Sequence, residues 1–430
     1  KSMRLETADI KTSRDFLGHF FGDKVGKKTL SNRLKTFKTY EHSNDFWWQV
    51  IPDYLKNYII NGGLSNHIIN NDNEIESFGM IPQYALLLLR SNAILPVIVI
   101  DGTFQSSIFR GSLIIVMTVS SNRTNIPLGW AWGPSENEET ANLILNLFKE
   151  AQPNIETIIS DEGTALKASI KAIFPDAVHK LCAWHISKSI DDKNVKKIFW
   201  ELLRCEHPII FQNLIYRLFK LNDSLPSILS DGKINMFSRF FEGVKQNDLI
   251  TSSPCESVNA DIKHLKTSPP IKVFHFLELI GFNRCLDLIN IPTKMTTYYN
   301  KRKKHLEFKA QRLQVIKEES YETSRTIIDP KYPLDIRWEV NTRNYSCPCG
   351  KFTDRGFPCA HLVKAFKDQN LSYDEFVHPC YMVSTIKEAL KDIHSPVTLA
   401  GLHPEEAIKV PKDHTKNSRS TRYPFGFEKK

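Results

Sequence analysis

The residues with the clearest chemistry lie near the C-terminus, where a Cys-x-Cys pair is followed by a Cys-x-His pair. They are Cys347, Cys349, Cys359 and His361. Each pair places two ligands on one short turn, and the loop between the pairs can fold back to complete a tetrahedron. Thiolate and imidazole ligands of this kind suit zinc. The spacing therefore predicts one bound Zn²⁺; the alternatives are four unrelated residues or two disulfides in a secreted protein.

Carboxylates further upstream predict a second kind of metal site. Asp101 follows the β-branched run 97–100, and Asp161 follows the run 155–159, so each lies just beyond an expected strand. That position is the usual edge for catalytic groups in open α/β sheets. Two divalent ions about 3.5–4 Å apart need several oxygen ligands, so a third acidic residue is required. The best candidate for it is Glu256.

Glu256 also has a purely structural interpretation. Ser253 would be the N-cap of a helix, with Pro254 as the first helical residue and Glu256 as the N3 partner in a capping box. The two interpretations are compatible, because a helix whose N-terminus points at the metals could present this carboxylate to them.

The elements that must position these acids follow an alternating pattern. Strands are expected at 97–100, 113–119, 126–132, 155–159 and 178–182. Ser135 and Glu138 predict a capping box that opens a helix after the third strand, and a second helix is expected at 164–174. Three meandering strands followed by βαβ units make a mixed α/β sheet with helices on its faces. This order is the one found in the ribonuclease-H-like fold.

The whole chain has 430 residues, which predicts two or three domains. The first expected segment is a mainly helical region at 1–85, for DNA binding or dimerisation. A catalytic core is expected in two parts, at 86–186 and, with basic helices, at 251–330, and a helical insertion at 187–250 separates them. A zinc module at 335–385 and a basic flexible tail at 386–430 follow.

Composition narrows the class of protein. Hydrophobic residues make up 41% and charged residues 24% of the chain, as in folded soluble proteins. The net charge of +9 fits a polyanionic partner. Eight cysteines spread along the chain argue against a disulfide scaffold and favour a reducing compartment. The polar N-terminal stretch predicts no signal peptide, and the apolar region 84–100 is broken by Arg90 and Pro96, so no membrane partner is expected.

Five short patterns in a fixed order are more specific than any one of them. They are Asp101-Gly102-Thr103-Phe104, Ser160-Asp161-Glu162-Gly163, Cys182-Ala183-Trp184-His185, Glu256-Ser257-Val258-Asn259 and the Cys/His pattern downstream. In these residues the chain resembles the Mutator-like (MULE) transposases, and the last pattern resembles a SWIM-type zinc finger. The resemblance covers about residues 85–385. A departure from the family is that no clear zinc-binding DNA-recognition domain precedes residue 85, so recognition of transposon ends is unassigned.

The resemblance implies a DDE nuclease in which Asp101, Asp161 and Glu256 hold two Mg²⁺ (or Mn²⁺) ions that cut and rejoin DNA. It also implies a helical insertion between Asp161 and Glu256. The expected function is that of a nuclear transposase that cleaves double-stranded DNA at terminal inverted repeats and joins the ends to target DNA. A homodimer is expected because two ends must be paired. The alternatives are a domesticated transcription regulator that has lost catalysis, which retention of the three acids argues against, and a nuclease of the same fold that never joins strands.

Two further groups are predicted to contact DNA. Cys182, Trp184 and His185 are expected to shape the nucleic-acid path near Asp161, with Trp184 either in the core or stacked on an unpaired base. Half of a second zinc site is the alternative for Cys182 and His185, although no second pair lies at a suitable spacing. The basic residues Arg302, Lys303 and Lys304 are predicted to contact phosphates, or else to form a solvated helix face or a nuclear-import signal.

Overall fold

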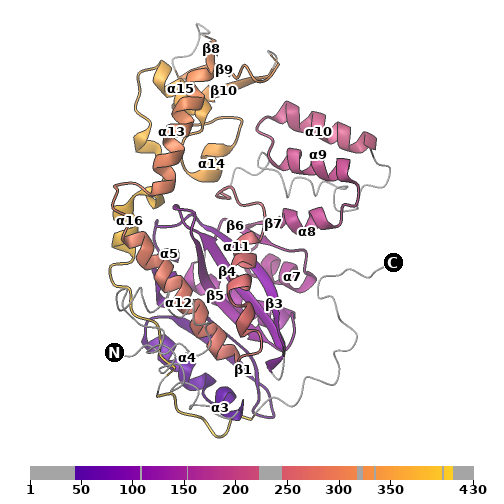
Figure 1. Cartoon of the computed structure of the whole chain (residues 1–430), viewed down its shortest axis with the longest axis vertical. Coiled ribbons are helices and arrows are strands. Elements are labelled where there is room, and N and C mark those ends of the chain that lie inside the picture. The colour runs from indigo at the N-terminus through magenta and orange to yellow at the C-terminus, as the bar shows by residue number, and fades with distance from the viewer. Residues whose placement is uncertain are drawn as a thin grey trace, which may run out of the picture.

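A computed structural model describes residues 44–106, 109–152, 154–221, 245–316, 323–333, 336–399 and 401–409. Figure 1 shows a central sheet covered by helices, a smaller C-terminal module beyond one end of it and a group of short helices beside that module. Residues 1–43 of the region predicted at 1–85 lie outside the described residues. The same holds for residues 410–430 of the tail predicted at 386–430.

The centre of the molecule is a seven-stranded mixed sheet with the order β1-β2-β5-β4-β3-β6-β7. Its strands are β1 (Leu64–Ile69), β2 (Ile75–Ile81), β3 (Val97–Gln105), β4 (Gly111–Val119), β5 (Asn125–Gly133), β6 (Thr157–Ser160) and β7 (Val178–Leu181). Neighbours from β1 to β3 pair antiparallel, whereas β6 and β7 run parallel to β3. The meander of three strands followed by βαβ units is therefore confirmed, and with it the ribonuclease-H-like fold.

The sheet extends further than the sequence pattern indicated. Helices α3 (Asn44–Gln49) and α4 (Ile51–Ile60) fit the helical region predicted before residue 85, but β1 and β2 pair with β5 and lengthen the sheet. Almost every residue of β2 is buried on both faces, so the strand lacks the alternation that marks a half-exposed strand. The boundary predicted at residue 85 therefore falls inside the sheet domain.

Helices cover both faces of the sheet (Figure 1). On one face α4 packs with α11 (Ser253–Asp261) and the first half of α12 (Pro270–Ile289). On the other face the core is built by α5 (Gln83–Leu89), α6 (Glu138–Ala151), α7 (Thr164–Ile173) and the second half of α12. Burial on both sides explains why the central strands are nearly continuous apolar runs.

Two smaller cores lie outside the sheet domain. The helical insertion consists of α8 (Ala183–Lys188), α9 (Lys193–Leu203) and α10 (Pro208–Leu221). The C-terminal module combines α13 (Thr297–Arg312), the antiparallel strands β8 (Gln314–Ile316), β9 (Ser324–Ile328) and β10 (Arg337–Asn341), and the helices α14 (Lys351–Arg355) and α15 (Ala360–Asp368). Short 3₁₀ helices occur at η3 (Lys263–Leu265), η4 (Asp374–Phe376) and η5 (Pro379–Tyr381).

The segment after the C-terminal module packs back onto the sheet domain, where a flexible tail was predicted. Helix α16 (Val383–Ala389) joins the core on one face of the sheet, and Leu402 and Ile408 join the core on the other. The Glu405 N–H donates to the carbonyl of Gln49 at 2.9 Å. We call the described residues 391–399 and 401–409 the C-terminal strap. Within the described part of the chain, no helix has the length and apolar character needed to span a bilayer.

Candidate active site

The strand register brings Asp101 and Asp161 to the same level of the sheet. Strands β3 and β6 pair in parallel, with Val99 opposite Ile159. Continuing that register by two residues places Asp101 beside Asp161, on the same face as Val99 and Ile159, because side chains alternate along a strand. Both aspartates are buried, with 5% and 2% of their surfaces exposed. The prediction that the ends of β3 and β6 bring two carboxylates together is in line with this arrangement.

Helix α11 brings Glu256 to the same face. The Cys255 thiol on this helix donates to the carbonyls of Val99 at 3.6 Å and Ile115 at 3.7 Å, so the helix lies directly against β3 and β4. Both Asp101 and His185 are influenced electrostatically by the Glu256 carboxylate. Four elements thus contribute residues to one site, which lies where β6 ends and is called the active edge below. They are β3, β6, α8 and α11.

The capping box predicted for α11 does not form. The N-cap is Ser252, one residue earlier than expected, and no side chain caps the helix. The Ser252 hydroxyl donates instead to the Cys182 sulfur at 3.3 Å. One carboxylate oxygen of Glu256, Oε1, is buried and has no hydrogen-bond partner in the described structure. A capping role in α11 therefore does not explain the position of the Glu256 side chain.

A fourth carboxylate at this edge was not found from the sequence. Glu136 lies between β5 and α6, in the run Ser135-Glu136-Asn137-Glu138. The N-cap of α6 is Asn137, whose side chain accepts the Thr140 N–H at 2.9 Å, so the predicted Ser135 capping box is wrong. With several polar residues in succession, nothing in the local sequence distinguishes the one that turns toward the sheet.

The pKa values of the acids at this site are raised, because few positively charged groups compensate them. Burial raises the pKa of Asp101 well above its ordinary value, and the neighbouring carboxylates Asp161, Glu256 and Glu136 raise it further, as does Cys182. Burial also raises the pKa of Asp161, against the opposing effects of the Gly163 N–H at 3.2 Å and of His185. Burial and the charge of Asp161 together raise the pKa of Glu136 to about 7.

A hard cation fits this donor set. One oxygen on each of the four acids is buried without a hydrogen-bond partner among the described residues: Asp101 Oδ1, Asp161 Oδ2, Glu256 Oε1 and Glu136 Oε2. Buried, unpaired carboxylate oxygens are costly unless a cation compensates them, and an all-oxygen set suits Mg²⁺ or Mn²⁺. Among the described residues, the ligand atoms of the Cys/His cluster come close enough together to hold an ion, whereas the four acids do not form such a group.

The Cys182–His185 segment lies at the entrance to this edge, but its members differ in exposure. Cys182 is fully buried, and its sulfur accepts the Ser252 N–H at 3.1 Å, so the predicted DNA contact is corrected to an internal role for this thiol. Trp184 and His185 are half-buried on α8, and the Lys188 ammonium lies 3.2 Å from the centre of the Trp184 ring. Burial lowers the pKa of His185, while Asp161 and Glu256 act in the opposite direction. No metal cluster that includes Cys182 or His185 is present in the described part of the chain.

The predicted basic residues lie on α13, away from the acids. Lys303 forms an ion pair with Asp374 at 2.6 Å, which ties α13 to the end of the C-terminal module. Arg302 is half-buried, and Lys304 is exposed. Lys304 is therefore the member of the trio that is most available to a phosphate.

The predicted zinc ligands converge as expected. The ligand atoms of Cys347, Cys349, Cys359 and His361 all lie within 4.8 Å of one another. The sulfurs of Cys347 and Cys349 are 3.4 Å apart, and His361 Nδ1 lies 3.5 Å from Cys347 Sγ and 3.9 Å from Cys359 Sγ. A tetrahedral zinc with normal bond lengths requires edges of about 3.6–3.8 Å, so one Zn²⁺ fits this cluster. The Trp338 ring stacks on His361 at 4.5 Å between ring centres and helps to orient it.

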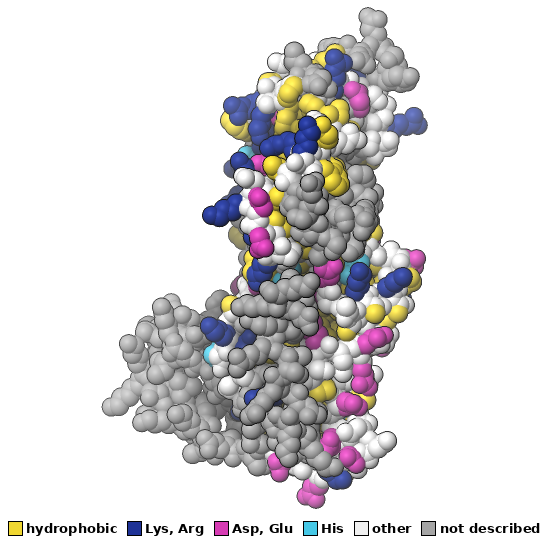
Figure 2. All heavy atoms as spheres, turned by 90° about the vertical axis from the view of Figure 1, so that its right-hand side faces the viewer, with side chains coloured by type: hydrophobic (Ala, Val, Ile, Leu, Met, Phe, Trp, Pro, Cys, Tyr) yellow, Lys and Arg dark blue, Asp and Glu magenta, His cyan; other side chains and the backbone are white. Residues whose placement is uncertain are grey.

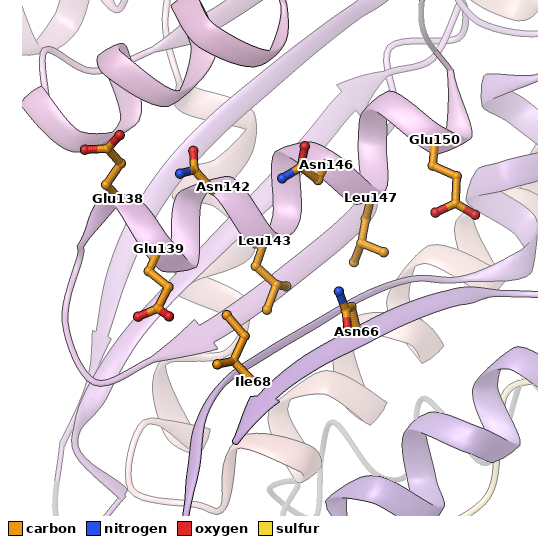
Figure 3. Close-up of a pocket in the computed structure, with 9 residues that line it drawn as sticks. All are labelled: Asn66, Ile68, Glu138, Glu139, Asn142, Leu143, Asn146, Leu147 and Glu150. Atoms are coloured by element: carbon orange, nitrogen blue, oxygen red, sulfur yellow. The ribbon is translucent and has the colours of Figure 1, made fainter. Parts of the chain in front are cut away.

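A groove of 510 Å³ lies elsewhere, between β1 and α6 (Figure 3). Its lining includes the carboxylates of Glu138, Glu139 and Glu150 and the amides of Asn66 and Asn142. Three acidic side chains would repel a phosphate backbone, and none of the four converging acids lines the groove. The groove is therefore separate from the candidate active site.

Comparisons with known proteins find a family match in the first part of the sheet domain. Residues 97–189 match a family model described as the MULE transposase domain, a stretch that runs from β3 to the end of α8 and includes Asp101 and Asp161. No curated protein matches the chain. Among solved structures, the chain is similar to the Drosophila P element transposase strand transfer complex, at 11% sequence identity over 91% of this chain and 86% of that one. The TM-score is 0.22, at which the likeness supports no conclusion about this chain.

Proposed function

We propose that this protein is a DNA transposase that cuts double-stranded DNA at terminal inverted repeats and joins the ends to target DNA, because residues 97–189 match the model of the MULE transposase domain. The observation that carries the proposal is the meeting of Asp101, Asp161 and Glu256 at one sheet edge, each with a buried oxygen that lacks a partner. Three remote stretches of chain supply these groups, which a protein that only binds DNA has no need to bring together.

The residues would divide the work as follows. Asp101 and Asp161 are fixed by neighbouring strands, so they form the rigid part of a two-ion site. Glu256 arrives on α11, after the helical insertion, and completes the ligand set. Bound there, two Mg²⁺ or Mn²⁺ ions would activate the attacking hydroxyl and stabilise the departing 3′-oxygen. The zinc cluster would serve to hold the C-terminal module together.

The DNA path is proposed to run from the active edge toward the C-terminal module. On the face drawn in Figure 2, Lys and Arg side chains gather toward the upper end, where that module lies in Figure 1, and Asp and Glu gather toward the lower end. Trp184 and His185, which are half-buried on α8, and Lys304, which is exposed on α13, would be the residues that contact DNA. Pairing of two transposon ends would require a homodimer, and genomic DNA as the substrate would place the protein in the nucleus.

The test is incubation of the full chain with labelled DNA that carries the sequences flanking its gene, in the presence of Mg²⁺ or Mn²⁺. The wild type should yield cut ends and strand-transfer products. Asp101→Asn, Asp161→Asn and Glu256→Gln should each abolish cutting while DNA binding persists, because each removes a metal ligand without changing the size of the side chain. Glu162→Gln, which alters an exposed carboxylate next to Asp161, is the matched control and should cut normally.

Three outcomes separate the possibilities. Cutting with joining supports a transposase. Cutting without joining would identify a nuclease of this fold, and binding without cutting would identify a DNA-binding regulator. A Glu256→Gln protein that cuts at the wild-type rate would remove that residue from the site.

A further inference from the structure

The position of Glu136 sets it apart from the other acidic residues around α6. Glu138 and Glu139, in the first turn of that helix, are exposed, whereas Glu136 is half-buried and carries an oxygen, Oε2, that is fully buried without a partner in the described structure. No ion pair with Glu136 occurs among the described residues either. A carboxylate in that position costs stability unless something else compensates its charge.

The backbone of β3 is shaped to receive this carboxylate. A β-carbon added at Gly102 would lie 2.9 Å from Glu136 Oε1 and 3.1 Å from its carboxyl carbon. The carboxylate therefore occupies the space that a side chain at position 102 would fill. Since Gly102 directly follows Asp101 within β3, the Glu136 carboxylate lies at the same level of the strand as Asp101.

Electrostatic effects link Glu136 to three further acids, although side chains alternate along β3, so position 102, where Glu136 lies, and Asp101 are on opposite faces of the strand. Asp101 is almost wholly buried, with an unpaired Oδ1, and it is influenced electrostatically by Asp161, Glu256 and Glu136 together. Glu136 in turn is influenced by Asp161. Each of the four carboxylates thus has one buried oxygen without a hydrogen-bond partner in the described structure, and electrostatic effects connect them.

On the premise of the proposed function, we propose that Glu136 is a fourth carboxylate of the catalytic metal site and contributes a ligand, directly or through a bound water, to one of the two divalent ions. Gly102 is the positioning residue that leaves room for it. Metal ligation by Glu136 would explain both its unpaired oxygen and the glycine at position 102. It also means that the site extends beyond the three acids expected from the sequence motifs.

The experiment measures Mn²⁺ binding to the zinc-loaded full chain without DNA, from the electron paramagnetic resonance signal of free Mn²⁺. Glu136→Gln should raise the Kd for Mn²⁺ by about tenfold or more, since loss of a group that supports a metal typically costs 10–100-fold in affinity. Glu138→Gln, a matched change in an exposed acid two residues away, should leave both the Kd and the stoichiometry unchanged. Asp101→Asn should weaken binding at least as much as Glu136→Gln.

A second variant tests the same assignment from the other side. Gly102→Ala should leave the melting temperature near that of the wild type, because the group it meets is the end of a flexible side chain, yet it should weaken Mn²⁺ binding by pushing Glu136 aside. If Asp101→Asn weakens binding while Glu136→Gln and Gly102→Ala both bind like the wild type, Glu136 is not part of the site and the proposed function stands. If none of the variants, Asp101→Asn included, alters binding, the proposed metal site itself is wrong.

Discussion

Asp101 and Asp161 hold equivalent positions in neighbouring parallel strands, yet their charges are compensated differently. Asp161 accepts the Gly163 N–H at 3.2 Å and lies close to His185, and both favour its ionised form. Every neighbouring charge that acts on Asp101 is negative or becomes so on ionisation. The ionised form of Asp101 therefore lacks the compensation that Gly163 and His185 give Asp161, and a bound cation would supply it.

Replacing this aspartate should separate stability from function. Asp101→Asn should raise the melting temperature of the metal-free protein near neutral pH, because it removes a buried carboxyl group whose ionisation is opposed by burial and by the neighbouring acids. Each kcal/mol recovered corresponds to roughly 2–4 °C for a cooperative unit of about 150–250 residues. The variant should also lose the stabilisation that Mg²⁺ gives the wild type. Thermal unfolding in EDTA and in Mg²⁺ measures both effects, and a lower melting temperature in EDTA would contradict the account of Asp101.

At the scale of elements, α12 carries a buried acid that has no part in the active site. Glu278 is 4% exposed, beside Tyr54 and Tyr58, and accepts the Val397 N–H at 3.2 Å. Burial raises the pKa of this carboxyl to about 8, against an ordinary value of 4.5. The side chain is thus a neutral acid at pH 7, and its contribution depends on keeping that proton.

The free energy of unfolding should therefore fall as the pH rises from 4.5 to about 8. The unfolded chain releases the Glu278 proton near pH 4.5, while the folded chain keeps it up to about pH 8. The contribution is fully present below pH 4.5 and is lost as the pH rises toward 8. Glu278→Gln should flatten the decline, since the amide stays neutral throughout. Melting temperatures at pH 5 and pH 8 for both proteins test this, and equal declines would show that Glu278 does not titrate as described.

What could be predicted from the sequence also divides by element. The apolar runs in β3, β4, β5 and β6 made these strands predictable, although β3 continues past the predicted end at residue 100, so Asp101 lies within the strand while Asp161 follows β6. Strand β2 contains Glu76 and Ser77, has no clean period of two and was missed because both of its faces are covered. Glu136 was missed for a different reason, since a loop acid acquires its role only when the tertiary fold places Gly102 beneath it.

At the scale of the whole molecule, one ion-pair cluster joins three parts of the chain. Asp248 lies in the segment before α11 and pairs with Arg123, after β4, at 3.0 Å and with Arg355, at the end of α14, at 2.5 Å. Asn247 and Asp248 both have positive φ angles, at 55° and 59°, in a conformation that is uncommon for residues other than glycine. The N–H groups of Gln246 and Asn247 donate to the Asp354 carbonyl. The C-terminal module thereby holds the turn that leads to Glu256.

Breaking this cluster should be costly to the whole protein. Asp248→Asn leaves the Arg355 guanidinium, whose side chain is 6% exposed, without its carboxylate. Removing one partner of a buried pair costs about 3–5 kcal/mol, so the free energy of unfolding in urea should fall by about that amount. The control is Asp261→Asn, which breaks the more exposed pair with Arg284 and should cost about 0–1 kcal/mol. Equal losses of unfolding free energy in the two variants would show that the Asp248 ion pairs stabilise the protein no more than an exposed pair does.

The C-terminal strap has a consequence for how the polypeptide is made. Residues from Trp47 to Ile408 share one hydrophobic core, so one face of the sheet is sealed only by almost the last part of the described chain to leave the ribosome. Until then the nascent protein carries an open apolar surface and the unpaired edges of new strands, which makes it prone to aggregate. Synthesis in the cell should therefore rely on chaperones that shield this surface until translation is nearly finished.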